Sequence, residues 1–110
     1  MKVSEIPNDA DGDAIRRVFD HGSDPMRPMK VDFHVAMPNE KNGRAFAEIV
    51  ASRGYEPDLS FDQELQEWTC SCSRTMLLEY DALLKCQKEL DEISAPFDGF
   101  SDGWGTFGNE

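Results

Sequence analysis

The chain lacks an apolar run close to the roughly 20 residues of a membrane-spanning helix. Its first seven residues lack the apolar centre of a signal peptide. It has three cysteines, and this odd number fits a reducing compartment better than a disulfide framework. These absences argue against a membrane protein or a secreted one, and they predict a cytoplasmic location.

Common signatures of catalysis are also missing. There is no Gly-x-Ser-x-Gly sequence, phosphate-binding loop or dinucleotide fingerprint. The two histidines, His21 and His34, have no evident serine or cysteine partner. Carboxylates are plentiful, so an acid–base pair in a cleft stays open as a minor alternative. The main prediction is a protein that is not an enzyme.

Metal and cofactor sites are poorly supported. Cys70 and Cys72 are predicted to lie on one face of a strand, with their thiols about 7 Å apart. That face is the apolar one, whereas His34 belongs to the polar face of its own strand, so we expect core cysteines rather than a zinc site. The aspartates of residues 9–13 resemble a calcium loop, but Ala14 stands where a glycine is needed. We predict no metal and no cofactor.

Basic residues are few and unevenly placed. Eleven Lys and Arg face 22 Asp and Glu, for a net charge of −11. No Lys or Arg occurs in residues 54–73 or after Lys88. Such a chain repels phosphate backbones, so we expect no direct contact with nucleic acid, and we expect a basic protein partner instead.

Hydrophobic periodicity predicts one domain over residues 11–110, preceded by a loose leader of residues 1–10. Asp11 is predicted to cap a short first helix that ends at Gly22. Alternation over residues 29–37 predicts the clearest strand. A helix over 40–53 follows, with Asn39 as its N-cap, and then come a strand with Pro57 at a sheet edge and a strand starting at Trp68. The longest helix is predicted over 75–94, with Met76 and Leu84 among its apolar residues.

The tail from Asp98 to Gly108 combines three aromatic residues with four glycines. We interpret it as a last strand that closes the sheet, and as a sharper alternative it also presents an exposed recognition surface. The predicted order is β-α-β-β-α-β after the leading helix. It indicates an α+β, ferredoxin-like βαββαβ sandwich, in which a four-stranded antiparallel sheet carries two helices on one face.

This topology predicts an acidic pole. The end of the first strand, the hairpin between the second and third strands, and the start of the fourth strand should lie at one end of the sheet. The carboxylates predicted at that end are Glu40, Asp62, Glu64, Glu67, Asp91, Glu92 and Asp98.

Three motifs resemble one protein family. Residues 102–107, Asp-Gly-Trp-Gly-Thr-Phe, look like the closing motif of the ribonuclease E inhibitor family called regulator of ribonuclease activity B. Residues 21–25 and 53–56 resemble that family's turn after its first helix and its junction before the second strand. The resemblance implies an acidic α+β protein that binds protein rather than RNA. It also implies, as partner, the arginine-rich, non-catalytic C-terminal part of ribonuclease E.

The leading hypothesis is therefore a small regulatory protein that binds and inhibits ribonuclease E, as a monomer or a weak homodimer. The alternative is an acidic interaction domain of the same fold that binds another basic protein, as an antitoxin or immunity protein does. The candidate contact residues are Asp102, Trp104 and Phe107. The candidate steering charges are Glu64, Glu67, Asp91 and Asp98.

Overall fold

Strand β1 (Met29–Met37) forms where the sequence alternates, and its bounds match the prediction. Val31, Phe33 and Val35 are fully buried, whereas the residues between them are partly exposed. This period of two sends one face of the strand into the core. The computed structural model of the chain describes residues 6–109. Within them, β1 is a central strand of the sheet.

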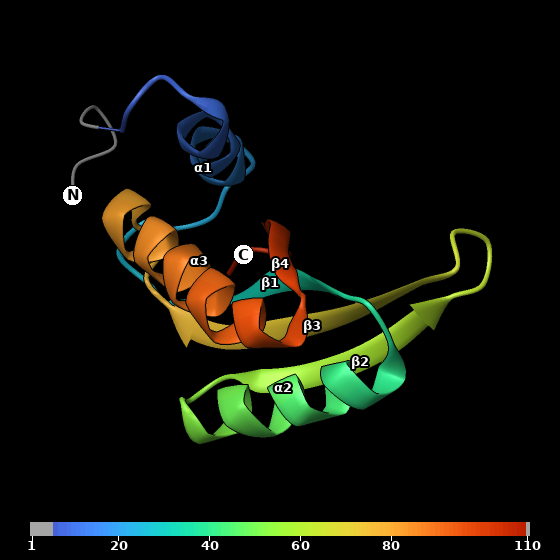
Figure 1. Cartoon of the computed structure of the whole chain (residues 1–110). Helices are drawn as coiled ribbons and strands as arrows, with labels where there is room; N and C mark the ends of the chain where they lie inside the picture. The colour runs from blue at the N-terminus through green and yellow to red at the C-terminus, as the bar shows by residue number, and fades with distance from the viewer. Residues whose placement is uncertain (1–5, 110) are drawn as a thin grey trace.

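Three further strands complete an antiparallel sheet in the order β2-β3-β1-β4 (Figure 1). They are β2 (Glu56–Asp62), β3 (Glu67–Met76) and β4 (Phe100–Thr106). β1 pairs with β3 on one side and with β4 on the other. The predicted place of Pro57 is confirmed, because β2 is an edge strand.

Helices α2 (Glu40–Ser52) and α3 (Tyr80–Ser94) cover one face of this sheet. Asn39 caps α2 as predicted, because its side chain accepts the amide of Asn42 at 2.8 Å. Phe46 and Val50 of α2 and Leu83 and Leu90 of α3 are fully buried against the strands. The predicted α+β, ferredoxin-like arrangement is thus confirmed. No helix within residues 6–109 is long and apolar enough to cross a membrane.

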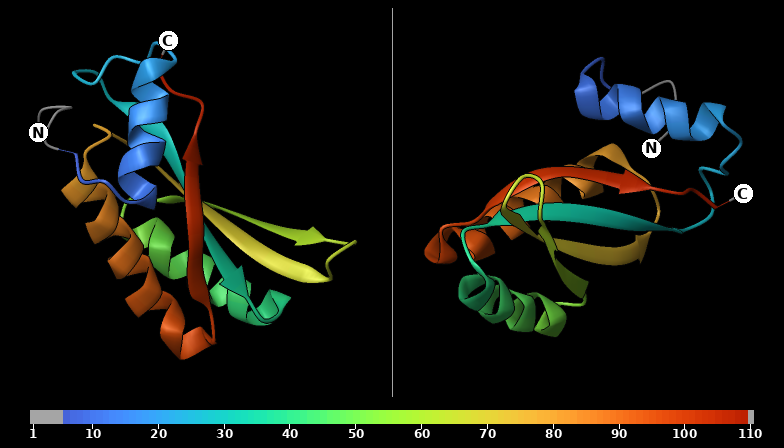
Figure 2. Two further views of the ribbon diagram at one scale, coloured as in Figure 1. Left: turned by 90° about the horizontal axis from the view of Figure 1, so that it is seen from above. Right: turned by 90° about the vertical axis from the view of Figure 1, so that its right-hand side faces the viewer.

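Helix α1 (Ala10–Asp20) lies beside the β4 edge of the sheet, next to the start of α3 (Figure 2). The predicted cap at Asp11 is wrong, because Asp9 accepts the amide of Gly12 at 2.8 Å. A Cβ on Gly12 would lie 1.9 Å from the carbonyl oxygen of Pro7, so the chain before the helix folds back onto its first turn. Ile6 is buried in the core, and residues 1–5 of the predicted leader lie outside the described residues.

The longest helix starts later than predicted. β3 continues to Met76, which pairs with Met29 at the start of β1, and α3 begins at Tyr80. The assignment of Met76 to the helix is therefore wrong, because pairing with β1 extends strand β3 to this residue. Leu84, predicted on the apolar side of the helix, is 37% exposed. A short 3-10 turn, η2 (Ala95–Phe97), links α3 to β4.

Candidate protein-binding surface

The tail motif forms a β-bulge on the edge strand β4. Phe33 pairs with Trp104 and Val35 pairs with Ser101, so two residues, Asp102 and Gly103, lie opposite the single residue His34. Gly103 has a φ of +93°, a conformation that favours glycine. The Asp-Gly pair therefore sets the bend of the strand, and Asp102 is exposed at that bend.

Trp104 connects this bulge to helix α1. Its ring is partly buried against the core, and its indole Nε1–H donates to Oδ1 of Asp11 at 3.0 Å. Burial of a tryptophan normally requires such a partner for its N–H. The structure therefore gives Trp104 an internal packing role that is sufficient to explain its presence in the motif.

The end of the chain holds the turn that follows α1. The Asn109 side chain accepts the Asp24 amide at 2.8 Å and donates to the carbonyl oxygens of Asp24 and Arg27 at 2.9 and 2.8 Å. The Asn109 amide donates to Oγ of the buried Ser23 at 3.3 Å. We name this set of contacts the clasp. It joins the closing motif to the turn at residues 21–25, although they are far apart in the sequence.

Phe107 lies next to the clasp and is 99% exposed. A fully exposed phenylalanine side chain adds no buried apolar area, so packing does not explain its presence. Of the three predicted contact residues, Phe107 and Asp102 are accessible, and Trp104 is partly covered. Phe107 is therefore the aromatic contact candidate that the structure leaves available.

Two of the four predicted steering charges have a local structural role. Oδ1 of Asp91 accepts the Ser101 amide at 2.6 Å and so joins α3 to β4. Asp98 ends the 3-10 turn in a left-handed conformation, with a φ of +59°. Both side chains are exposed, but their place in the chain is explained without a partner.

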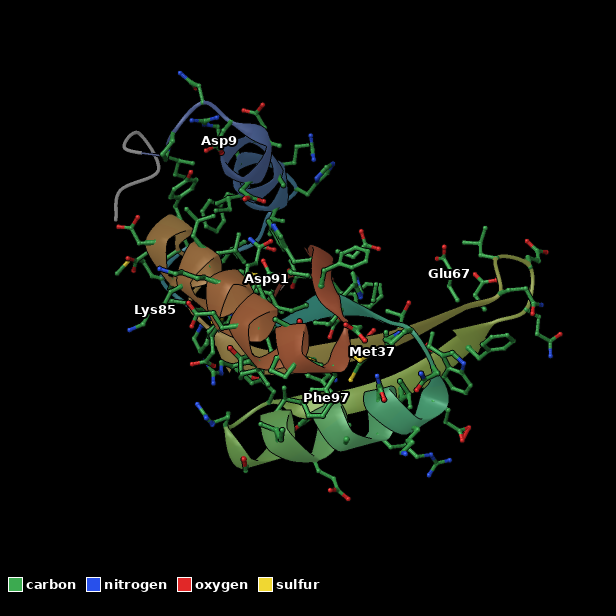
Figure 3. All side chains as sticks on the ribbon, in the orientation of Figure 1. Asp9, Met37, Glu67, Lys85, Asp91 and Phe97 are labelled. Carbon is green, nitrogen blue, oxygen red and sulfur yellow. The ribbon has the colours of Figure 1, made fainter. Side chains whose placement is uncertain are left out.

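Glu64 and Glu67 belong to the hairpin between β2 and β3, which extends away from the helices (Figure 3). The turn is fixed by Asp62, whose Oδ1 accepts the amides of Glu64 and Leu65 at 2.9 and 3.1 Å. Both glutamates are exposed. Because the Asp62 side chain holds these two amides, the carboxylates of Glu64 and Glu67 are presented to solvent on an ordered turn.

The predicted acidic pole divides into separate groups. The strand ends meet as expected, since Met37 pairs with Trp68 and Ala36 pairs with Phe100. Figure 3 nevertheless shows Glu67 on the extended hairpin and Asp91 on α3, with Met37 between them. The hairpin therefore carries its charges away from those of α3.

An acidic surface runs instead along the edge strand, with Ser60 between its carboxylates and with Lys30 Nζ of β1 at 4.0 Å from Glu56. Residues directly opposite in the ladder share a face, and Asp58 pairs with Ser71, Glu56 with Ser73 and Asp62 with Glu67. This is the face opposite the helices. We call the acidic strip the exposed carboxylates Glu56, Asp58, Asp62 and Glu67 of this face together with Glu64 of the adjoining turn.

Glu56 and Asp58 were not among the contact residues predicted from the sequence. The signal was present, since both alternate with the apolar residues Pro57 and Leu59. The pairing of Asp62 with Glu67 sets two like charges directly opposite, which costs stability in an isolated sheet. A basic partner would relieve that repulsion.

The rest of the open face is polar and hydrogen-bonded. Ser73 donates to Oδ1 of Asp32 at 2.5 Å, and Nδ1 of His34 lies 3.2 Å from Oγ of Ser71. Asp58 lies across Ser71 from His34 in the ladder, so this row does not have the order Asp-His-Ser that activates a nucleophile. The face can therefore offer hydrogen bonds beside the acidic strip.

The cysteines lie in the core, as predicted. Cys70 and Cys72 are fully buried with their sulfurs 3.9 Å apart, which is closer than the sequence predicted. The hydrogen bond that Cys72 donates to Cys70, and then burial, raise the pKa of the Cys72 thiol. Among residues 6–109, no group of three or more His, Cys, Asp or Glu could hold a metal ion.

Comparison with known proteins supplies the family. A search of curated proteins found no match to this chain. The family model described as regulator of ribonuclease activity B matches residues 8–106, which include α1, the whole sheet and the bulge motif of β4. Because this match covers nearly the whole chain, the protein belongs to the regulator of ribonuclease activity B family.

Proposed function

We propose that this protein binds an arginine-rich segment of ribonuclease E through the acidic strip and thereby lowers the activity of that enzyme. The observation that carries the proposal is the strip itself. Five exposed carboxylates lie in a stretch of the chain that contains no Lys or Arg. Membership of a family of ribonuclease regulators supports the class of partner.

The spacing of the strip suits an extended basic peptide. Positions two residues apart on a strand are spaced by about 6.6 Å along it, and alternate residues of an extended peptide have the same spacing. Arginines at alternate positions could therefore reach successive carboxylates such as Glu56 and Asp58, and at Glu56 the guanidinium would displace Lys30, whose Nζ lies 4.0 Å from that carboxylate. Each guanidinium can bind a carboxylate through two parallel hydrogen bonds. Because β2 is an edge strand, its outer backbone groups are also available to a peptide.

The proposal makes this chain a regulator of another enzyme and not an enzyme itself. A net charge of −11 opposes direct contact with RNA, so the effect on RNA decay acts through the protein partner. Asp102 and Phe107 lie at the opposite edge of the sheet, in β4 and directly after it, so they supply short-range contacts only to a partner that spans the sheet. The protein then acts where ribonuclease E acts, in the cytoplasm.

Binding to the C-terminal half of ribonuclease E across a salt series tests the proposal. We expect saturable binding that weakens as salt rises. The variant Glu64→Lys with Glu67→Lys should weaken it by at least about tenfold, which corresponds to about 1.4 kcal/mol. The matched control is Asp20→Lys with Glu48→Lys, which makes the same change in net charge at exposed positions away from the strip.

Equal losses in the two variants would show that net charge alone matters and would refute a role for the strip. Absence of binding at low salt would refute ribonuclease E as the partner. The alternative is then an acidic interaction domain that binds another basic protein, in the manner of an antitoxin or immunity protein. The strip favours that reading equally, so the identity of the partner separates the two.

A further inference from the structure

An open groove separates α2 from α3 on the helical face of the molecule. Its volume is about 760 Å³, and its apolar lining comes from Ile49 of α2, Ile93 of α3 and Phe97 of the 3-10 turn. Ile93 and Phe97 pack against the core, and all three side chains remain partly exposed. The groove therefore offers apolar surface that the fold does not cover.

The rim of this groove is unusually basic for an acidic protein. Arg53, Lys85 and Lys88 line it and are exposed, and Glu89 and Glu92 line it as well. The rim thus has three basic residues and two acidic ones, whereas the whole chain has 11 basic and 22 acidic residues. None of the ion pairs found among residues 6–109 includes Arg53, Lys85 or Lys88.

The hairpin between β2 and β3 has the complementary character. Leu65 at its tip is 65% exposed and Phe61 at its base is 40% exposed. Glu64 and Glu67 flank Leu65, and no cation occurs in residues 54–73. The tip is thus a small apolar projection surrounded by negative charge, and the cartoon shows it extending from the body of the molecule (Figure 1).

We propose that the α2–α3 groove binds the β2–β3 hairpin of a second copy of this chain. Leu65 enters the apolar lining, and Glu64 and Glu67 meet Lys85, Lys88 and Arg53. The turn is held by the Asp62 side chain and by a 2.7 Å bond from Gln66 to the carbonyl oxygen of Gln63. A turn that is already ordered loses little conformational entropy on binding.

Two features make this association weak. A hairpin in one groove buries less surface than a stable interface needs, roughly 1,200 Å² in total. Each copy also carries −11, so two copies repel at long range until salt screens them. The contact joins different surfaces of the two copies, so each added copy leaves one groove and one hairpin open unless the assembly closes.

Self-association has a regulatory consequence that rests on the proposed function. Glu64 and Glu67 belong both to the hairpin and to the acidic strip. A hairpin that is bound in a groove cannot receive a basic partner at those two carboxylates. Self-association and partner binding therefore compete. The self-association itself does not depend on which basic protein the strip binds.

Sedimentation velocity of the purified chain at 0.15 M salt tests the proposal, over roughly 0.02 to 1 mM protein, the range that resolves weak association. We expect the average mass to rise with concentration. Glu64→Lys with Glu67→Lys should abolish the rise, and so should Lys85→Glu with Lys88→Glu. Leu65→Ser should reduce it. The matched controls, Asp20→Lys with Glu48→Lys and Arg27→Glu with Lys41→Glu, should leave it in place.

Mixing the two charge-reversed proteins gives the decisive result. Each alone sets like charges in the contact, whereas the mixture offers matched pairs, so association should return. A constant monomer mass up to 1 mM would overturn the proposal. So would association that survives both reversals, because another surface would then be responsible. The proposal would also be overturned if the groove bound another acidic protein segment but did not bind the hairpin.

Discussion

Replacing Gly103 by alanine should show how much of the tail motif is backbone geometry. Gly103 has a φ of +93°, which an L-residue rarely adopts. A Cβ built there meets no atom within 4 Å, so collision with neighbours adds nothing to the cost. The left-handed conformation itself costs about 1–2 kcal/mol. The lower entropy of alanine in the unfolded chain returns about 0.4–1 kcal/mol, so we expect a net loss of about 1 kcal/mol.

Gly105→Ala is the matched control. It lies two residues away in the same strand, and its backbone is not left-handed. A Cβ there would lie 3.9 Å from Nε2 of His34, which is an ordinary contact. We therefore expect its free energy of unfolding to stay within about 0.5 kcal/mol of the parent.

Urea unfolding of the three proteins measures these differences, and thermal unfolding should show a midpoint about 4 °C lower for Gly103→Ala. A neutral Gly103→Ala would refute the argument, because the bulge would then not depend on a left-handed residue. Equal losses at both positions would also refute it, since a general requirement for small residues in β4 would be responsible.

Three further predictions concern the contacts of α1 and the clasp. Trp104→Phe should lower the free energy of unfolding by about 1–2 kcal/mol in a urea assay, because it leaves Asp11 without its indole donor. The control Trp68→Phe loses no such bond and should lower the free energy of unfolding by less. The hydrogen bond from Tyr80, and then the one from the Gly12 amide, hold the pKa of Asp9 below 3.8. The stability that this lowered pKa contributes is present at neutral pH and is lost as the pH falls through the lowered value. Tyr80→Phe should therefore raise the Asp9 pKa toward 3.8 in a carbon NMR titration. Asn109→Ala should speed hydrogen exchange at the Asp24 amide, and an unchanged rate would mean that the clasp does not form.

The sequence predicted the elements that depend on local pattern. Alternation placed β1 with its observed bounds, because a strand buried on one face repeats every two residues. The cap at Asn39 and the edge position of Pro57 followed from local backbone chemistry. The motifs of residues 21–25, 53–56 and 102–107 were sufficient to indicate the family that the family model matches.

Boundaries were harder, because neighbouring strands decide them. The local sequence pattern predicted Met76 to be helical, but its pairing with Met29 extends β3 to this residue. In the same way, Asp11 was the expected cap, and it serves instead as the acceptor for Trp104, which is 93 residues away in the chain.

The tertiary structure alone decided which conspicuous residues are accessible. The sequence marks Trp104 and Phe107 as equally unusual, yet one packs beneath α1 and the other is 99% exposed. Composition established that the chain is acidic, and its run without cations located the charge within residues 54–73. Only the pairing of β2 with β3 arranged those carboxylates into one strip on the open face, because which residues share a face depends on the register between strands.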